Sequence, residues 1–233
     1  MNQLSLLETL DTDLVLADDE RGRITYTSGF ISAIEARELF AEVRADAEWD
    51  AQRRRMYDRD VDVPRLTSGY RIEGGEKPVP PRLRAAAERV VNALRVPFTN
   101  IGLNLYRTGH DSVAPHNDHL EELERGWPIV LLSLGATRRM TVRAKQPPKR
   151  VIHQDLAAGS LFLMSYDTQI HYTHGIPKTD DIVGERISLA FRVRPAEKTS
   201  MRYWVGTRTS VRLTPDSSPI NASNRSSDLP STP

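Results

Sequence analysis

The chain has 233 residues and no cysteine. This composition excludes disulfides, thiolate zinc sites, iron–sulfur clusters and cysteine nucleophiles, and it allows an intracellular compartment. No apolar run approaches the roughly 20 residues that a membrane-spanning helix needs, and residues 1–8 lack the basic start and apolar run of a signal peptide. We therefore expect no membrane segment and an intracellular, cytoplasmic location, with nucleoid or nucleus as alternatives. The formal net charge of +1 argues neither for nor against nucleic acid.

Two helices are expected at residues 29–96, after a lead-in at 1–28 that carries one short strand near 23–26. Ser32 and Glu35 have the spacing of a capping box, which is typical of a helix start. A pair of prolines opens the second helix, whose apolar residues recur at helical spacing. These stripes indicate core packing.

After residue 97 the pattern changes to strands. Short apolar runs between glycine and proline turns are typical of an antiparallel sandwich or jelly roll, so we expect a mostly β fold with N-terminal α-helices (α+β). Residues 53–55, three arginines, are expected in a polar connection. Residues 209–233 are expected to form a disordered tail, because they offer almost nothing apolar to bury. The expected strands are 61–63, 66–70, 100–107, 113–118, 128–134, 139–144, 161–165 and 186–194.

A histidine and an aspartate stand two residues apart in the expected strand 113–118. Strand side chains repeat every two residues, so His116 and Asp118 would share a face. An imidazole and a carboxylate are two of the three ligands in the triad that holds non-haem Fe(II). Such a pair alone is more often a surface pair. Downstream, His171 and His174 are two candidates for the third ligand.

The last strand carries two arginines on one face. Alternation places Arg186 and Arg192 there, with a small serine and alanine between them. A solvated face explains such a pattern, but a polar trough with a guanidinium at either end also suits a dicarboxylate, because each guanidinium can bind a carboxylate with two hydrogen bonds. On a second strand, Asn104 and Tyr106 share a face and are plausible further donors.

These motifs, in this order, resemble the AlkB-like Fe(II)/2-oxoglutarate dioxygenases. The resemblance covers about residues 52–195. It implies a dioxygenase domain at 29–208, with helical support at 29–96 and a double-stranded β-helix (jelly-roll) core at 97–195, and a lid that faces a nucleotide. We expect a monomer. The segments that carry the resemblance are 104–107, 111–118, 133–138, 159–161, 174–177 and 186–192.

The resemblance implies a metal site that binds Fe(II), with 2-oxoglutarate and O2 as cosubstrates. His116 and Asp118 match the first two iron ligands. The family's distal histidine comes just before a turn with a small residue, isoleucine and proline, which matches His174. His171 would then line the site or be structural.

The resemblance also implies cosubstrate contacts. Arg186 matches the residue that pairs with the distal carboxylate of 2-oxoglutarate, helped by Tyr106. Arg192 and Asn104 match residues near the carboxylate at the iron end. Ser188 stands where several relatives carry asparagine.

The substrate side departs from the family pattern. Leu120 occupies the position where base-repairing relatives often carry an acidic residue that reads the methylated base. The connection 74–81 carries no aromatic residue to stack on a flipped base, so Tyr57 or Tyr70 is the candidate substitute.

Residues 138–150 hold six basic side chains and no acidic one. Arg138 and Arg139 are thus candidates for phosphate contact, although a solvated β-ribbon explains the charges equally well. Glu121, Glu122 and Glu124 form an acidic patch that opposes such contact.

The resemblance implies an oxidative dealkylase that removes N-alkyl groups and repairs alkylated DNA or RNA bases. One alternative is a 2-oxoglutarate oxygenase that acts on a protein side chain or a small molecule. A second alternative is a non-catalytic jelly-roll module that binds a metal such as zinc through His116, Asp118, His171 and His174.

Overall fold

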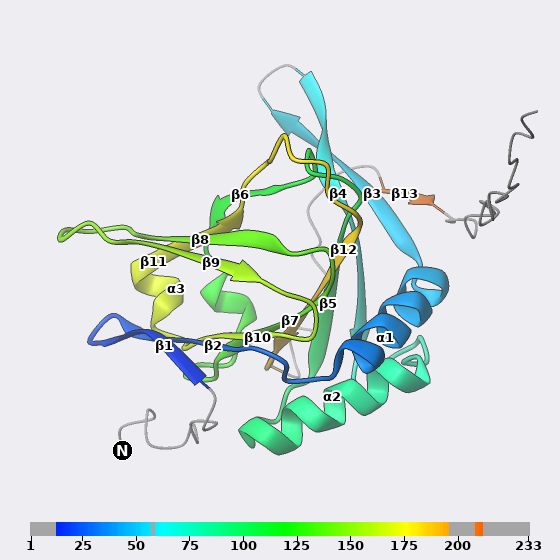
Figure 1. The fold of residues 1–233 in the computed structure, drawn as a ribbon, viewed down its shortest axis with the longest axis horizontal. Coiled ribbons are helices and arrows are strands. Elements are labelled where there is room, and N and C mark those ends of the chain that lie inside the picture. Colours follow the sequence, from blue (N-terminus) through cyan, green and yellow to red (C-terminus); the bar gives the residue numbers. More distant parts are fainter. Residues whose placement is uncertain (1–12, 57–58, 196–207, 212–233) are drawn as a thin grey trace, which may run out of the picture.

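A computed structural model of the protein describes residues 13–56, 59–195 and 208–211. Its strands form two antiparallel sheets (Figure 1). In spatial order, the larger sheet contains β1 (Asp13–Asp19), β2 (Gly22–Thr27), β10 (Leu161–Met164), β7 (Ile129–Gly135), β12 (Arg186–Arg192), β5 (Asn100–Tyr106), β4 (Arg59–Arg71), β3 (Trp49–Met56) and β13 (Arg208–Val211). The smaller sheet contains β6 (Val113–His116), β11 (Tyr172–Ile176), β8 (Arg138–Ala144) and β9 (Val151–Leu156).

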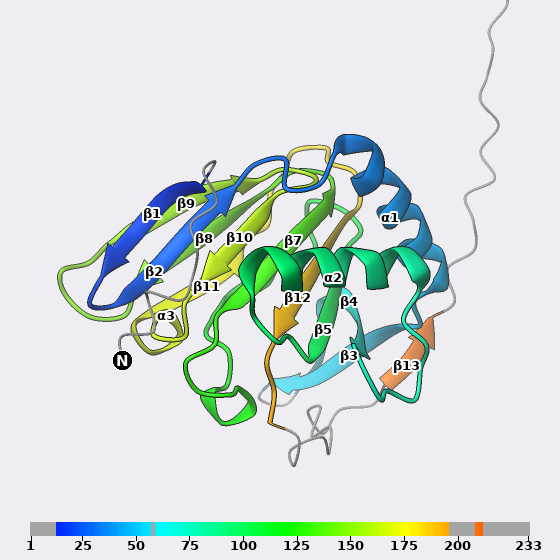
Figure 2. The ribbon, with the colours of Figure 1, turned by 90° about the horizontal axis from the view of Figure 1, so that it is seen from below.

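Two long helices cover one face of the larger sheet, α1 (Ala33–Asp46) and α2 (Pro81–Leu94) (Figure 2). The predicted capping box is confirmed, because Ser32 accepts from the Glu35 backbone while the Glu35 side chain accepts from the Ser32 backbone. α2 begins with proline, as predicted. Among the described residues, no helix is long and apolar enough to cross a membrane.

The core lies in two layers, which follow from alternation along the strands. On β12, Leu189 and Phe191 pack toward the helices, whereas Ala190 packs in the layer between the two sheets. Leu103 of β5 joins the helix layer and Tyr106 joins the intersheet layer. The polar trough predicted on β12 therefore faces the smaller sheet.

The fold is mostly β with few helices, and two facing sheets fit the predicted jelly roll. The expected N-terminal α-helices do not begin the fold, because β1 and β2 form an antiparallel hairpin before α1, and β2 contains the short strand expected near 23–26. The prediction of a polar connection at 53–55 is also wrong. These residues belong to β3, where backbone pairing with β4 makes a strand without an apolar pattern.

Other predicted strands are confirmed. The expected strands 100–107, 128–134, 139–144, 161–165 and 186–194 correspond to β5, β7, β8, β10 and β12 within two residues at each end. The pieces 61–63 and 66–70 are one strand, β4. At the C-terminal end, β13 pairs with β3, and residues 212–233 lie outside the described part of the chain.

Candidate active site

Two short strands of the smaller sheet bring two histidines together. β6 and β11 pair with His116 opposite His174, and their ring centroids lie 4.4 Å apart. Gly175 permits this approach, because a Cβ there would lie 2.8 Å from the Val113 carbonyl oxygen. Strand register thus sets the spacing of the two imidazoles.

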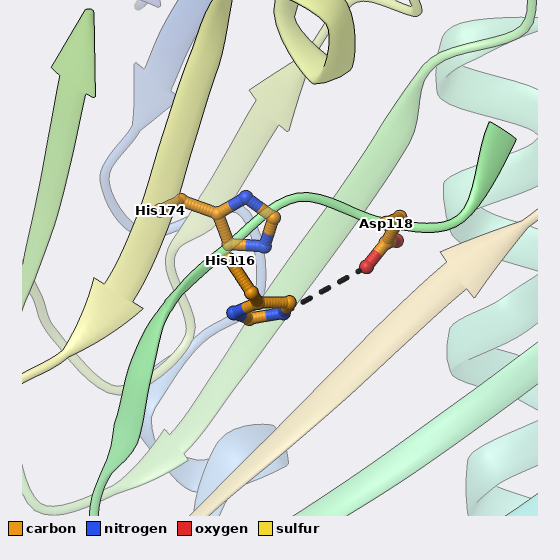
Figure 3. Close-up of side chains that lie close together, drawn as sticks. All are labelled: His116, Asp118 and His174. Carbon is orange, nitrogen blue, oxygen red and sulfur yellow. Dashed lines mark ion pairs between the residues drawn. The ribbon is translucent and has the colours of Figure 1, made fainter. Parts of the chain in front are cut away.

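Asp118 and these two histidines form a group of side chains that could hold one metal ion, the metal cluster (Figure 3). The expected strand 113–118 ends at His116, so Asp118 lies in the connection beyond it. Its Oδ1 lies 3.8 Å from His116 Nε2. One ligand atom from each of His116, Asp118 and His174 lies within 4.8 Å of the others, and in the part of the chain that the structure describes this is the only such group of three. His171, the last residue of α3 (Thr168–His171), is not a member.

The electrostatics of this cluster favour a bound cation. Burial lowers the pKa of His174 to about 3 and also lowers the pKa of His116 from its usual value. Burial favours the neutral form of Asp118, but the Arg192 guanidinium and the two histidines outweigh it and hold the pKa of this carboxyl well below its usual range. At neutral pH the cluster therefore offers two neutral imidazoles and one carboxylate, the donor set of a non-haem iron site.

The tautomer of one histidine is set by the backbone. His116 Nδ1 lies 3.0 Å from the Ala114 carbonyl oxygen, which can only accept a hydrogen bond. Nδ1 therefore carries the proton, and the Nε2 lone pair faces Asp118 and is available to a metal.

Arg192 is bonded to the metal cluster. Its Nε donates to Asp118 Oδ2 at 2.7 Å, and both side chains are mostly buried. Gly102 on the neighbouring strand leaves room for the guanidinium, because a Cβ there would lie 3.0 Å from Arg192 Nη1.

Arg186 has the opposite environment. It is 1% exposed, and its Nη2 donates to Ser133 Oγ at 3.0 Å. Its Nε and Nη1 have no hydrogen-bond partner among the described residues. The Tyr106 ring centroid lies 5.2 Å from the guanidinium carbon. Unsatisfied buried donors on a cation are costly, so this trough fits the carboxylate of a bound acid.

The trough between the two arginines is polar. Ser188 is buried and pairs with Asn104 of β5 on one side and Ser133 of β7 on the other. Asn104 Oδ1 accepts from Arg65 Nε at 2.8 Å, and the Arg65 charge contributes to the lowered pKa of His116. The sequence analysis missed Arg65. This residue lies far from the other site residues in sequence, and only the pairing of β4 with β5 brings it near them.

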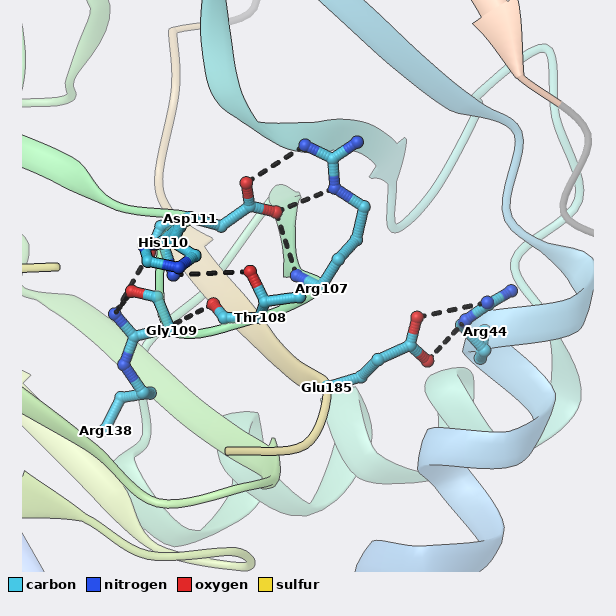
Figure 4. A network of polar contacts seen from close by, with 8 residues as sticks. All are labelled: Arg44, Arg107, Thr108, Gly109, His110, Asp111, Arg138 and Glu185. Atoms are coloured by element: carbon cyan, nitrogen blue, oxygen red, sulfur yellow. Dashed lines mark hydrogen bonds and ion pairs between the residues drawn. The ribbon is translucent and has the colours of Figure 1, made fainter. Parts of the chain in front are cut away.

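Arg138 does not occupy a position suited to phosphate contact (Figure 4). It is 4% exposed, and its guanidinium donates to four backbone carbonyls, those of Thr108, Gly109, Asp111 and Pro177. Arg138 therefore does not belong to a basic surface formed by residues 138–150, because the chain folds around its guanidinium. Arg139 is exposed and forms a two-bond pair with Asp155.

The candidate substrate residues do not form one surface. Tyr70 is a core residue at 7% exposure, because it shares a strand face with Leu66 beneath the helices; its expected role in base stacking is wrong. Leu120 is half-buried at the start of a short 3₁₀ turn, Leu120–Glu122. His171 is half-buried next to β11. Tyr57 lies outside the described residues.

Residues 23–192 match the 2OG-Fe(II) oxygenase superfamily. The chain belongs to the AlkB-like members of this superfamily. It is 30% identical over 188 residues to the DNA oxidative demethylase ALKBH2 of Homo sapiens, and the aligned region covers 72% of each protein. The bovine (Bos taurus) protein of the same name is 30% identical over 68% of this chain and 64% of its own length.

One further relative agrees with this membership, and one solved structure agrees with the fold. The AlkB-like oxygenase is 29% identical to the human (Homo sapiens) alpha-ketoglutarate-dependent dioxygenase alkB homolog 3 over 73% of this chain and 65% of the relative. The solved structure of OsALKBH1 superposes with a TM-score of 0.54 at 12% identity, covering 78% of this chain and all of that one. The last comparison supports the fold alone.

Proposed function

We propose that this dioxygenase binds Fe(II) and 2-oxoglutarate and removes N-alkyl groups from alkylated DNA or RNA bases. Membership of the superfamily supports the cosubstrate and the metal. The name of the ALKBH2 relatives, DNA oxidative demethylase, supports the nucleic-acid substrate.

One observation carries the proposal. The same strand, β12, carries Arg186, whose buried guanidinium has two donor atoms without a partner in the described part of the chain, and Arg192, which is bonded to Asp118 of the metal cluster. A dicarboxylate that spans the two would satisfy Arg186 at one end and reach the metal cluster at the other. A module that binds only a metal has no use for the buried charge of Arg186.

Each residue has a distinct part in this proposal. His116, Asp118 and His174 hold the iron. Arg186 and Tyr106 bind the distal carboxylate of 2-oxoglutarate. Arg192 and Asn104 lie near the other carboxylate, and the buried Ser188 lies between the two ends.

When bound, Fe(II) and 2-oxoglutarate use O2 to hydroxylate the carbon of an N-alkyl group, and the products are succinate, CO2, an aldehyde and the dealkylated base. The protein's own groups bind and orient the reactants. The lowered pKa values of His174 and Asp118 keep the cluster in one protonation state at neutral pH, with neutral imidazoles and an ionised carboxylate.

The test measures succinate and formaldehyde from the iron-loaded protein with 2-oxoglutarate and methylated oligonucleotides. The panel holds single- and double-stranded DNA and RNA with different methylated bases. We expect both products in equal amounts on at least one oligonucleotide, and their loss in His116→Ala. His153→Ala is the matched control, because His153 is exposed on β9 and contacts Thr141.

Two outcomes contradict the proposal. Unchanged succinate formation in His116→Ala would refute the metal site. Succinate without formaldehyde on every oligonucleotide would refute the substrate, and would favour a protein side chain or a small molecule.

A further inference from the structure

Asp118 lies where no strand supports its main chain. β6 pairs with β11 through Val113 and His116, and the chain then leaves the sheet. A metal ligand in such a connection needs another support, because ligand positions have to hold within about 0.5 Å for a functional site.

A buried glutamine supplies a contact at this point. Gln169 is 1% exposed in α3, and its Oε1 accepts from the Asp118 backbone N–H at 3.0 Å. The two residues are 51 positions apart in sequence. Sequence reasoning missed Gln169, because a single glutamine in a short helix has no periodic pattern.

The orientation of the Gln169 amide is fixed by its neighbours. Its Nε2 donates to Thr168 Oγ1 at 3.1 Å, and that hydroxyl donates in turn to the Ser165 carbonyl oxygen at 2.6 Å. Because the Thr168 hydroxyl proton is used there, Oγ1 must accept from the amide nitrogen. The amide oxygen is therefore the end that faces Asp118.

The short helix that carries Gln169 is itself held by β8. Lys145, directly after this strand, donates from Nζ to the Gln169 carbonyl oxygen at 2.8 Å. The Lys145 backbone N–H donates to the His171 carbonyl oxygen at 2.9 Å. Since β8 also pairs with β11, the same sheet positions Gln169 and His174.

We propose that Gln169 is a positioning residue of the metal centre, which fixes the main chain of Asp118 while Arg192 fixes its Oδ2. Together the two contacts direct Oδ1 toward His116. The inference rests on the proposed function in one respect, that Asp118 binds the metal. Replacing a residue that forms a hydrogen bond with a metal ligand typically changes metal affinity or activity by about 10- to 100-fold.

The test measures binding of Co(II) to the metal-free protein, together with the visible absorption of the bound Co(II), which reports its coordination geometry. Gln169→Met keeps the side-chain length and removes the acceptor, so we expect affinity to fall by about 10- to 100-fold and the absorption spectrum to change. Gln169→Glu retains an oxygen acceptor and is expected to restore most of the affinity. Gln154→Met is the matched control, because Gln154 lies on β9 and its side chain donates to the Asp155 carbonyl oxygen instead of to a residue of the metal cluster.

Asp118→Ala separates the two proposals. If it leaves Co(II) binding unchanged, the proposed metal site fails, and this inference fails with it. If Asp118→Ala loses binding while Gln169→Met binds with wild-type affinity and spectrum, the positioning role alone is refuted. Equal losses in Gln169→Met and Gln169→Glu would also refute it, because the acceptor would then not be the cause.

A measurement on the unaltered protein guards against variants that do not fold. Backbone hydrogen exchange of metal-free protein should show the Asp118 amide protected, although it lies outside a strand. Exchange at the rate of a solvent-exposed loop amide would overturn the inference.

Discussion

The two arginines of β12 share one face of one strand and stand six residues apart, yet they have opposite environments. Arg192 is bonded to Asp118, so its charge is matched within the protein. Arg186 is more deeply buried and has two donor atoms without a partner among the described residues. The same sequence pattern therefore bonds one arginine to the His116–Asp118–His174 cluster and leaves the other suited to a ligand.

Removing Arg192 has the largest expected effect on stability. Arg192→Met leaves the buried carboxylate of Asp118 without its cation, which typically costs about 3–5 kcal/mol of unfolding free energy. Urea denaturation of metal-free protein measures the loss. Added Co(II) should recover part of it, because a cation that binds only the folded state stabilises that state. A variant as stable as the wild type would show that the Arg192–Asp118 pair does not stabilise the fold.

Removing Arg186 tests the other environment. Arg186→Met should weaken 2-oxoglutarate binding by about 2–5 kcal/mol, as expected for loss of one partner of a buried charge pair, while Co(II) affinity stays the same. Metal-free protein should unfold at a higher urea concentration, because the variant no longer buries unsatisfied donors. Calorimetric titration and urea denaturation provide the two measurements. A less stable variant with normal 2-oxoglutarate affinity would mean that Arg186 is structural.

A second pair of arginines gives a smaller contrast. Arg138→Ala should lower the unfolding free energy by about 1–3 kcal/mol, because four backbone carbonyls lose their donor. Arg139→Ala removes an exposed pair and should change stability little. Urea denaturation of both variants measures the difference. Equal effects would contradict the distinct environments of these neighbours.

Sequence alone predicted the part of the site that follows from strand alternation. Arg186, Ser188 and Arg192 fall on the face of β12 turned away from the helix core, because side chains alternate in any strand. His174 was expected just before a turn, but it lies within β11 (Tyr172–Ile176). The structure then adds a register that puts His174 opposite His116, and pairing between distant strands leaves no trace in local periodicity.

The errors have a common cause, which is that tertiary contacts overrule local pattern. Tyr70 was expected at the substrate because it is aromatic, but the helices cover its face of β4. Arg138 was grouped with a charged ribbon, but two connections fold around its guanidinium. Asp118 was assigned to a strand that ends before it, and its support comes from Gln169, far away in sequence.

β6 is an edge strand of the four-stranded sheet and pairs with its neighbour, β11, through two residue pairs. An edge strand exposes backbone donors and acceptors to other chains. A cation shared by His116 and His174 would join this edge strand to β11 through two coordination bonds. Loss of the ion would then free the edge strand to pair with other chains and would also abolish activity, so we expect the iron-free protein to be the form that aggregates.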